Sequence, residues 1–214
     1  MKKWTLLCLL FSVAVFGSEN ARTELKNVYD LYCRAASDIN EHIPVLCELS
    51  RECSSVVEIG VREMNSTWGI LQGLAESPSP NGKYIGIDLS YPSAGVFTLA
   101  ERLSRENDIL FQFIKGNDMM IDIEPTDLLF IDSLHTYLHL TYELEKFSPK
   151  VRKYIAMHDT SAPWGEMDET SYLPEAESKY PKEISRNKRG LWPAVVDFLH
   201  HHPEWELKER RLNN

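Results

Sequence analysis

The chain has 214 residues, of which 43% are hydrophobic and 26% are charged, and its formal net charge is −9. This length suits one α/β domain with a sizeable core rather than two domains. The acidic balance argues against a general affinity for nucleic acid or for anionic membranes, because both partners need a basic surface. A small molecule or a cationic molecule is a more suitable partner.

The N-terminal residues have the layout of a secretory signal. Met1-Lys2-Lys3 gives a positive start, Trp4 to Phe16 is apolar, and small residues follow. The apolar run is too short to span a bilayer comfortably. We expect residues 1–17 to be a signal peptide or short anchor, with a buried terminal helix as the alternative, and residues 22–214 to form one domain. A cleaved signal would make the protein periplasmic or secreted; otherwise it would be membrane-anchored or cytoplasmic.

Helical spacing of apolar residues from Thr23 to Glu52, broken near Pro44, predicts two helices. A strand, a loop and a helix follow. The apolar run Val56–Ile59 ends at Gly60, and Ser66 can start a helix soon after it. A glycine there lets the backbone approach a ligand above the carboxyl end of a sheet, and the helix start adds unpaired N–H groups. An ordinary strand ending in a turn is the alternative.

Two further predicted strands end in polar residues, which we expect to lie at the same edge of the sheet. Residues 84–89 form the second predicted strand, with Asp88 at its carboxyl end. A carboxylate there can accept hydrogen bonds from ribose hydroxyls, although it can also cap a turn. After a charged helix over residues 94–106, residues 109–114 form the third strand, followed by Asn117 and Asp118. Turn formation alone would also select these two residues.

The next two predicted strands both end in acids. Residues 127–131 lead into Asp132, with His135 three residues later, and residues 154–157 lead into His158 and Asp159. Two acids that converge at neighbouring strand ends suit a hard divalent cation. His135 is a candidate base because its unperturbed pKa lies near neutrality. It could equally be a residue at the start of the helix predicted over residues 138–147.

The last part of the chain is more polar. Residues 161–187 are predicted to form a long loop or lid. Residues 193–201 are predicted to be a helix, and residues 205–212 alternate like a sixth strand.

The motifs together resemble one family over residues 56–160. The matching residues are Glu58, Gly60, Ser66 and Thr67, then Phe130, Ile131, Asp132, His135 and Tyr137, and finally His158, Asp159 and Thr160. This pattern resembles class I S-adenosylmethionine-dependent methyltransferases, in the branch that includes cephalosporin hydroxylase-like and sugar O-methyltransferase-like proteins. Asn65 stands where the family has a glycine, and the chain ends before the family's last antiparallel strand.

The resemblance implies a Rossmann-like three-layer α/β sandwich with a mostly parallel sheet. For the family's last strand two alternatives stay open: either the sequence is truncated or the sheet lacks that strand. It implies O-methylation of a small molecule or glycan, with His135 and Asp132 as catalytic residues. It implies S-adenosylmethionine bound by Glu58, Gly60, Ser66, Asp88, Asn117, Asp118 and Asp132. It also implies a divalent metal, Mg or Mn, held by Asp132, His158 and Asp159.

Two other functions stay open from the sequence. An exported, noncatalytic small-molecule-binding protein could retain this fold, because S-adenosylmethionine is made in the cytoplasm and an exported enzyme would lack its donor. A nicotinamide oxidoreductase also places an acid after the second strand. It would be expected to show Gly-x-Gly-x-x-Gly, which the segment from Gly60 does not. His158 could act as a base instead of a metal ligand.

Overall fold

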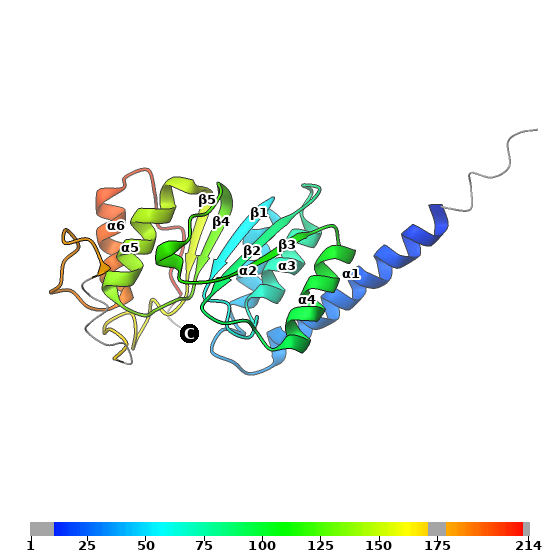
Figure 1. Ribbon diagram of the computed structural model, residues 1–214, viewed down its shortest axis with the longest axis horizontal. Coiled ribbons are helices and arrows are strands. Elements are labelled where there is room, and N and C mark those ends of the chain that lie inside the picture. Colours follow the sequence, from blue (N-terminus) through cyan, green and yellow to red (C-terminus); the bar gives the residue numbers. More distant parts are fainter. Residues whose placement is uncertain (1–10, 171–178, 212–214) are drawn as a thin grey trace, which may run out of the picture. The chain divides into compact units, whose positions relative to one another are not determined.

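The computed structural model describes residues 11–170 and 179–211, and for residues 11–18 it describes the backbone alone. Helices and strands alternate along most of the chain (Figure 1). In order, the elements are α1 (Phe11–Arg34), α2 (Ile43–Arg51), β1 (Ser55–Ile59), α3 (Thr67–Glu76), β2 (Lys83–Asp88), α4 (Ala94–Glu106), β3 (Leu110–Lys115), the 3-10 turn η1 (Asp118–Met120), β4 (Thr126–Ile131), α5 (Tyr137–Phe147), the 3-10 turn η2 (Ser148–Lys150), β5 (Val151–Met157) and α6 (Leu191–His201). The five strands predicted between residues 56 and 157 are all present.

The five strands form one sheet in the order β3-β2-β1-β4-β5. β4 pairs in parallel with β1 on one side and with β5 on the other. The chain therefore starts in the middle of the sheet, runs out to β3 and returns to β4, which is the doubly wound order of Rossmann-like folds. The predicted fold class is confirmed in this strand order, and the point where the order reverses lies between β1 and β4.

The chain forms two compact units. The first comprises the chain up to Ser55 together with residues 63–84 and 91–112, and the second comprises residues 56–62, 85–90 and the chain from Phe113 onwards. The carboxyl ends of all five strands belong to the second unit. The site described below lies inside that unit.

The core of the second unit explains how α5 is placed. Tyr137, Leu140, Leu144 and Phe147 recur at helical spacing on α5 and pack with buried residues of the strands and of α6. Thr136 caps the helix, because its hydroxyl accepts a hydrogen bond from the His139 N–H at 3.2 Å. Burial of one apolar stripe thus fixes the rotation of α5, and with it the direction of the polar residues between the apolar positions.

Close helix packing characterises the first unit. Gly69 and Gly73 lie one turn apart on α3, and a Cβ atom on either would stand within 2.5 Å of a backbone oxygen of α2. Only glycine permits helices to approach this closely. Ion pairs add to the packing: Arg51 of α2 binds Glu76 of α3 at 2.5 Å, and Arg102 of α4 binds Glu24 of α1 at 2.5 Å.

The predicted sixth strand is absent from the described residues. Residues 205–211 have no strand structure. Their alternation does not correspond to one buried face, since Leu207 is 49% exposed. Side chains hold the segment instead: the Arg210 guanidinium stacks 3.5 Å from the centre of the Trp192 ring, and Lys208 lies over the ring of Tyr154. The expectation of a sixth strand was therefore wrong, and the sheet has five strands in the part of the chain that the structure describes.

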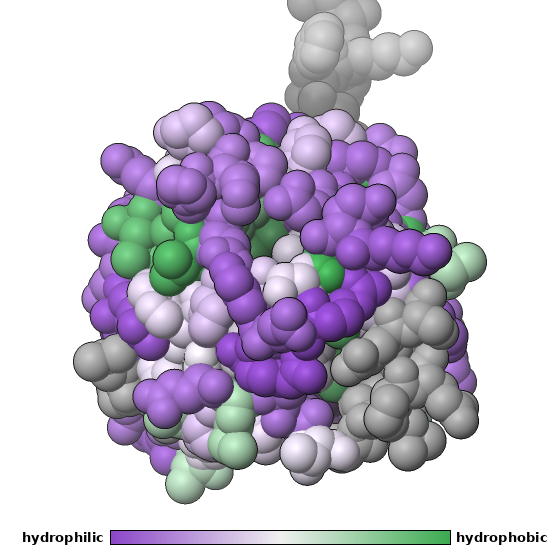
Figure 2. Space-filling model, turned by 90° about the vertical axis from the view of Figure 1, so that its left-hand side faces the viewer, coloured by the Kyte–Doolittle hydropathy of each residue, from purple (hydrophilic) through white to green (hydrophobic). Residues whose placement is uncertain are grey.

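The predicted signal segment, residues 1–17, lies mostly outside the described residues, which begin at Phe11 within α1. Among the helices that the structure describes, none combines the length and the hydrophobicity needed to cross a bilayer. The face of the molecule shown in Figure 2 is mainly hydrophilic, with hydrophobic residues gathered in limited areas. This surface agrees with the charged fraction of 26% and net charge of −9.

Candidate functional site at the strand ends

Backbone hydrogen bonds join the carboxyl ends of the five strands in a continuous row. In each bond, the first residue after one strand donates to the end of its neighbour. The bonds run from Gly116 N to Asp88 O (2.8 Å), from Gly60 N to Ile87 O (2.9 Å), from Asp132 N to Ile59 O (2.8 Å) and from His158 N to Ile131 O (3.1 Å). The residues that follow the strands therefore share one edge of the sheet, as the sequence predicted.

Gly60 lies at the switch point of the sheet, where the strand order reverses between β1 and β4. The conformation and packing at this position require a glycine. Its φ is +84°, a left-handed conformation that L side chains rarely adopt. A Cβ atom at this position would stand 1.9 Å from the backbone oxygen of Asp132. The turn after β1 can therefore lie against the end of β4 only because residue 60 is glycine.

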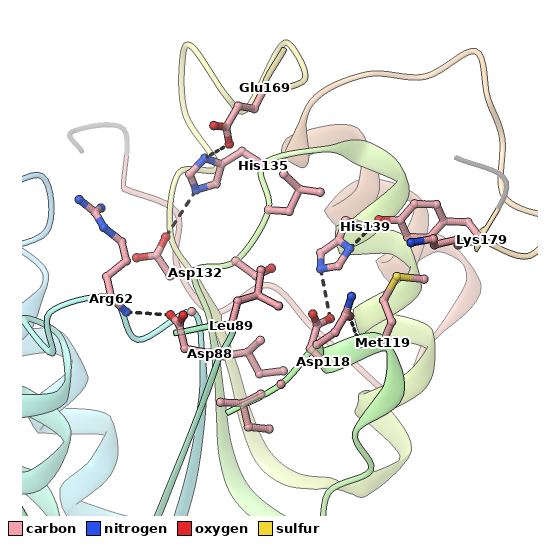
Figure 3. A pocket seen from close by; sticks show the side chains of 18 residues that line it. Arg62, Asp88, Leu89, Asp118, Met119, Asp132, His135, His139, Glu169 and Lys179 are labelled. Atoms are coloured by element: carbon pink, nitrogen blue, oxygen red, sulfur yellow. Dashed lines mark hydrogen bonds and ion pairs between the residues drawn. The ribbon is translucent and has the colours of Figure 1, made fainter. Parts of the chain in front are cut away.

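A pocket of about 280 Å³ opens above this edge (Figure 3). This volume is near the lower end of the range for ligand sites, roughly 300–1,000 Å³. Side chains and backbone from the ends of β1 to β4 line it, together with a residue of α5 and residues between β5 and α6. The lining residues are Ile59, Gly60, Arg62, Ile87, Asp88, Leu89, Gly116, Asn117, Asp118, Met119, Asp132, Ser133, Leu134, His135, His139, Glu169, Lys179 and Tyr180.

Asp88 lies in the pocket but is also bound to the loop after β1. Its Oδ2 accepts hydrogen bonds from the N–H groups of Val61 (2.8 Å) and Arg62 (2.9 Å), and its Oδ1 accepts one from Ser90 N (2.9 Å). A carboxylate offers about four acceptor positions. Asp88 therefore fastens the loop to β2, as the capping alternative expected, and keeps capacity on Oδ1, so its role towards a ribose stays a prediction.

The residues after β3 are likewise partly engaged in local structure. The side-chain oxygen of Asn117 accepts a hydrogen bond from Met119 N at 2.9 Å and so caps η1. Its amide nitrogen can still donate to a ligand. Asp118 turns its Oδ2 towards His139 Nε2, at 3.1 Å. The turn and the ligand interpretations of this segment are compatible.

Two of the predicted cofactor-binding residues do not line the pocket. Glu58 lies within β1 and is fully buried, at 0% exposure. Ser66 stands at the start of α3 and is 4% exposed. The structure places them below the surface, so their assignment to a cofactor rests on the sequence motif alone.

The predicted acceptor-side residues come together in one cluster. His135 Nε2 lies 3.1 Å from Asp159 Oδ2 and 3.6 Å from Asp132 Oδ1. His158 Nδ1 lies 3.2 Å from the same Asp159 oxygen and 3.5 Å from the same Asp132 oxygen. One ligand atom from each of Asp132, His158 and Asp159 falls within 4.8 Å of the others, a spacing that a metal ion can bridge.

Charge interactions in this cluster shift the pKa values of its members. Burial alone would lower the pKa of His135, but contacts with Asp132 and Asp159 raise it to about 9. In the same way, burial opposes and the two carboxylates raise the pKa of His158 to about 10. Burial would raise the pKa values of both aspartates, but the histidines hold them below the ordinary range. Without another cation, two imidazolium groups therefore balance two carboxylates at neutral pH.

Sequence reasoning missed Glu169, which orients His135. Glu169 Oε2 lies 3.2 Å from His135 Nδ1, and Glu169 N donates a hydrogen bond to His135 O at 2.8 Å. Trp164 stacks on the His135 ring, with centroids 5.7 Å apart and an angle of 19° between the planes. A carboxylate on one ring nitrogen directs the other towards Asp132, as Figure 3 shows, and towards Asp159. Both residues come from the polar loop, where no periodic pattern marks them.

No family model and no curated protein matches the chain. Among solved structures, the chain is similar to the O-methyltransferase from Bacillus cereus in complex with SAH, with 15% identity over 91% of this chain and 86% of that chain and a TM-score of 0.48. It is similar to the SAH-bound Podospora anserina methyltransferase PaMTH1, with 10% identity over 96% and 91% of the two chains and a TM-score of 0.47. It is also similar to the O-methyltransferase TomG from Streptomyces achromogenes, involved in tomaymycin synthesis and in complex with SAM, with 14% identity over 91% and 85% and a TM-score of 0.46.

Proposed function

We propose that the chain is an S-adenosylmethionine-dependent methyltransferase that methylates an oxygen atom of a small molecule or glycan. The observation that carries the proposal is the pocket at the switch point of the sheet. It brings Gly60, Asp88 and Asn117 to one edge and places Asp132 and His135 beside them. Open α/β sheets bind their ligands at this position.

The polar groups of the pocket fit an adenosyl ligand. Asp88 Oδ1 accepts one backbone hydrogen bond and can take another from a ribose hydroxyl. The amide nitrogen of Asn117 can donate to a ring nitrogen of the adenine. Gly60 lines the pocket at the end of β1 and lets the turn lie against the end of β4.

Methyl transfer from a sulfonium needs alignment more than it needs a reactive side chain. When bound, S-adenosylmethionine supplies the methyl group: the acceptor oxygen forms the new bond to carbon as the carbon–sulfur bond breaks, and the acceptor loses one proton. Burial would raise the pKa of Asp132, but His135 and His158 lower it, so Asp132 is ionised and can hold the acceptor hydroxyl by a hydrogen bond, although its low pKa makes it a weak base. His135 holds a proton at neutral pH while both aspartates face it, and can act as a base only when another cation balances those carboxylates.

We further propose that Asp132, His158 and Asp159 hold a divalent metal, with His135 beside it. The two carboxylates and the imidazole nitrogen converge within bridging distance. A donor set that includes imidazole favours Mn²⁺ over Mg²⁺. Such an ion supplies Lewis acidity, which lowers the pKa of a hydroxyl that it coordinates. Glu169 would fix the His135 ring in this site as carboxylates do around metal-binding histidines.

Calorimetry with S-adenosylmethionine and with S-adenosylhomocysteine tests the cofactor assignment. The parent chain should bind both ligands, and Asp88→Asn should bind them at least roughly 10-fold more weakly, because it loses a charged acceptor worth about 1.5–3 kcal/mol. Glu101→Gln, at an exposed position on α4, is the matched control and should bind like the parent. Absence of heat with a folded parent chain, or equal affinities of Asp88→Asn and the parent, would contradict the proposal.

A second candidate function is an exported, noncatalytic binding protein that retains the fold. One observation favours it: Asp88 already accepts three backbone hydrogen bonds, which leaves less capacity for a ribose. Residues 1–17 remain the proposed export signal. Mass spectrometry of the chain from fractionated cells separates the two functions. A processed chain outside the cytoplasm would favour the binding protein, and an unprocessed cytoplasmic chain would favour the enzyme.

A further inference from the structure

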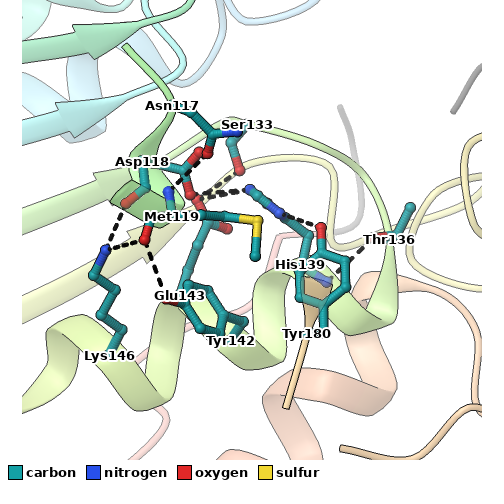
Figure 4. A network of polar contacts seen from close by, with 10 residues as sticks. All are labelled: Asn117, Asp118, Met119, Ser133, Thr136, His139, Tyr142, Glu143, Lys146 and Tyr180. Atoms are coloured by element: carbon teal, nitrogen blue, oxygen red, sulfur yellow. Dashed lines mark hydrogen bonds and ion pairs between the residues drawn. The ribbon is translucent and has the colours of Figure 1, made fainter. Parts of the chain in front are cut away.

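A second cluster of ligand-type side chains lies at the wall of the pocket (Figure 4). Asp118 belongs to η1, just after β3, whereas His139 and Glu143 lie one turn apart on α5. Residues four apart share one face of a helix, so both point towards the same place. His139 Nε2 lies 3.1 Å from Asp118 Oδ2 and 3.6 Å from Glu143 Oε1.

The cluster is more deeply buried than the one around Asp132. Glu143 is 0% exposed, and the side chains of His139 and Asp118 are 7% and 13% exposed. Glu143 Oε1 accepts a hydrogen bond from the Ser133 hydroxyl at 2.7 Å. Glu143 Oε2 and Asp118 Oδ2 have no hydrogen-bond partner within the described part of the chain. Two carboxylates thus direct acceptor oxygens into an interior space, which is costly unless a cation or a proton neutralises them.

The orientation of His139 is fixed from its other side. His139 Nδ1 lies 2.7 Å from the hydroxyl of Tyr180, and the two rings meet edge to face. This contact leaves Nε2 turned towards the two carboxylates. A partner on the second ring nitrogen is the usual support of a metal-binding histidine.

The spacing of the atoms is that of neighbouring ligands around one ion. Two ligand atoms about 2.1 Å from an ion, at angles between about 90° and 109°, lie roughly 3.0–3.4 Å apart. The distances of 3.1 Å and 3.6 Å from His139 Nε2 are close to this spacing. The 3.1 Å contact with Asp118 Oδ2 does not have the alignment of a hydrogen bond. An ion between these atoms accounts for both facts.

We propose that Asp118, His139 and Glu143 bind a divalent first-row transition-metal ion, at a site separate from the Asp132 cluster. One imidazole nitrogen and two carboxylates suit Zn²⁺, Mn²⁺ or Co²⁺ better than Mg²⁺ or Ca²⁺, which prefer oxygen ligands alone. The proposal stands on these side chains and does not depend on the proposed methyltransferase function.

The surrounding contacts prepare this site in advance. Lys146, on the same helix, donates hydrogen bonds to the backbone oxygens of Asp118 (2.7 Å) and Met119 (2.9 Å). The Tyr142 hydroxyl donates to the Met119 oxygen at 3.2 Å. The face of α5 that carries the two ligands therefore also holds the loop that carries the third. The bound ion joins this loop, which borders the pocket, to α5.

Equilibrium dialysis of the metal-stripped full chain against Co²⁺, with the bound metal counted by mass spectrometry, tests the proposal. His139→Gln and Glu143→Gln should each bind one equivalent less than the parent and lose part of the visible absorption of protein-bound Co²⁺. His202→Gln is the matched control, because His202 also lies between two glutamates, at 3.1 Å and 3.2 Å, but its side chain is 24% exposed. It should bind as many equivalents as the parent.

The variant that combines Asp132→Asn with His158→Gln distinguishes the two metal sites. It should keep one equivalent, which is lost when His139→Gln is added. If the parent binds one equivalent of Co²⁺ and His139→Gln binds none, the result would support this site. It would also contradict the metal proposed at Asp132, His158 and Asp159. Equal binding by the parent and His139→Gln would overturn the proposal. If the variants do not fold, crystals of the parent in saturating Zn²⁺ decide: an anomalous peak among the three side chains supports the site, and its absence overturns it.

Discussion

Replacement of Gly60 by alanine should strongly destabilise the fold and the pocket together. The left-handed conformation costs an L residue about 1–2 kcal/mol. The new Cβ atom would lie 1.9 Å from Asp132 O, whereas side-chain carbons do not approach closer than 3.0 Å, so the ends of β1 and β4 would have to separate by at least about 1 Å. This overpacking costs typically about 1–3 kcal/mol, and the bond from Asp132 N to Ile59 O contributes about 1 kcal/mol more if it is lost.

With that hydrogen bond lost, the expected loss is about 3–6 kcal/mol, which for a chain of this size corresponds to a fall in Tm of roughly 6–24 °C. Differential scanning calorimetry measures it directly. Gly95→Ala is the matched control, because a Cβ there meets nothing within 4 Å and residue 95 lies in the first turn of α4. It should leave the stability unchanged or raise it by up to about 1 kcal/mol. A Gly60→Ala chain that melts within about 2 °C of the parent would refute the reasoning about the switch point.

Three further predictions concern the surroundings of the site. Glu169→Ala should weaken Mn²⁺ binding at the proposed Asp132 site by roughly 10–100-fold in calorimetry, because His135 loses the carboxylate that orients it. Glu169→Gln should weaken Mn²⁺ binding less. Equal binding by the parent, Glu169→Ala and Glu169→Gln would contradict this role of Glu169. Burial and the Asp197 carboxylate raise the pKa of Tyr137 to about 12, so the neutral phenol stabilises the fold below pH 10 and this stability is lost as the pH rises towards 12. In urea unfolding, the Tyr137→Phe chain should therefore lose less stability than the parent between pH 10 and pH 12. An equal loss in both chains would be evidence against this role of Tyr137. Lys146→Met should weaken binding of S-adenosylhomocysteine several-fold, because the loop at residues 117–119 loses two hydrogen bonds. The secondary structure, measured by circular dichroism, should not change. An unchanged affinity for S-adenosylhomocysteine would contradict the role of this loop in binding.

Periodic patterns in the sequence were enough to predict the sheet and its edge. Short apolar runs end in Gly60, Asp88 and Asp132, and parallel strands bring such ends together. The predicted convergence of Asp132, His158 and Asp159 followed from the same rule, and the structure places their ligand atoms within 4.8 Å of one another. These features depend on local sequence and on strand direction alone.

Other features depend on tertiary contacts that no local pattern reveals. Glu169 lies in an irregular loop, 34 positions after His135 (169 − 135), and its backbone N–H donates a hydrogen bond to the His135 carbonyl oxygen. The engagement of Asp88 with the loop after β1 depends on left-handed backbone at Gly60 and Arg62. The false sixth strand arose because alternation over residues 205–212 was read as a buried face, although Leu207 is largely exposed. The sequence shows that His139 and Glu143 are spaced to share one face of a helix. It does not show that Asp118, which comes from a different element, lies beside them.

The most direct test of the account is a crystal structure of the chain grown with S-adenosylhomocysteine. The account predicts electron density for the ligand above the carboxyl ends of β1 and β2, with a ribose hydroxyl at Asp88 and the adenine beside Asn117. A well-ordered pocket that stays without ligand density at saturating concentration, or a ligand bound elsewhere on the molecule, would contradict it.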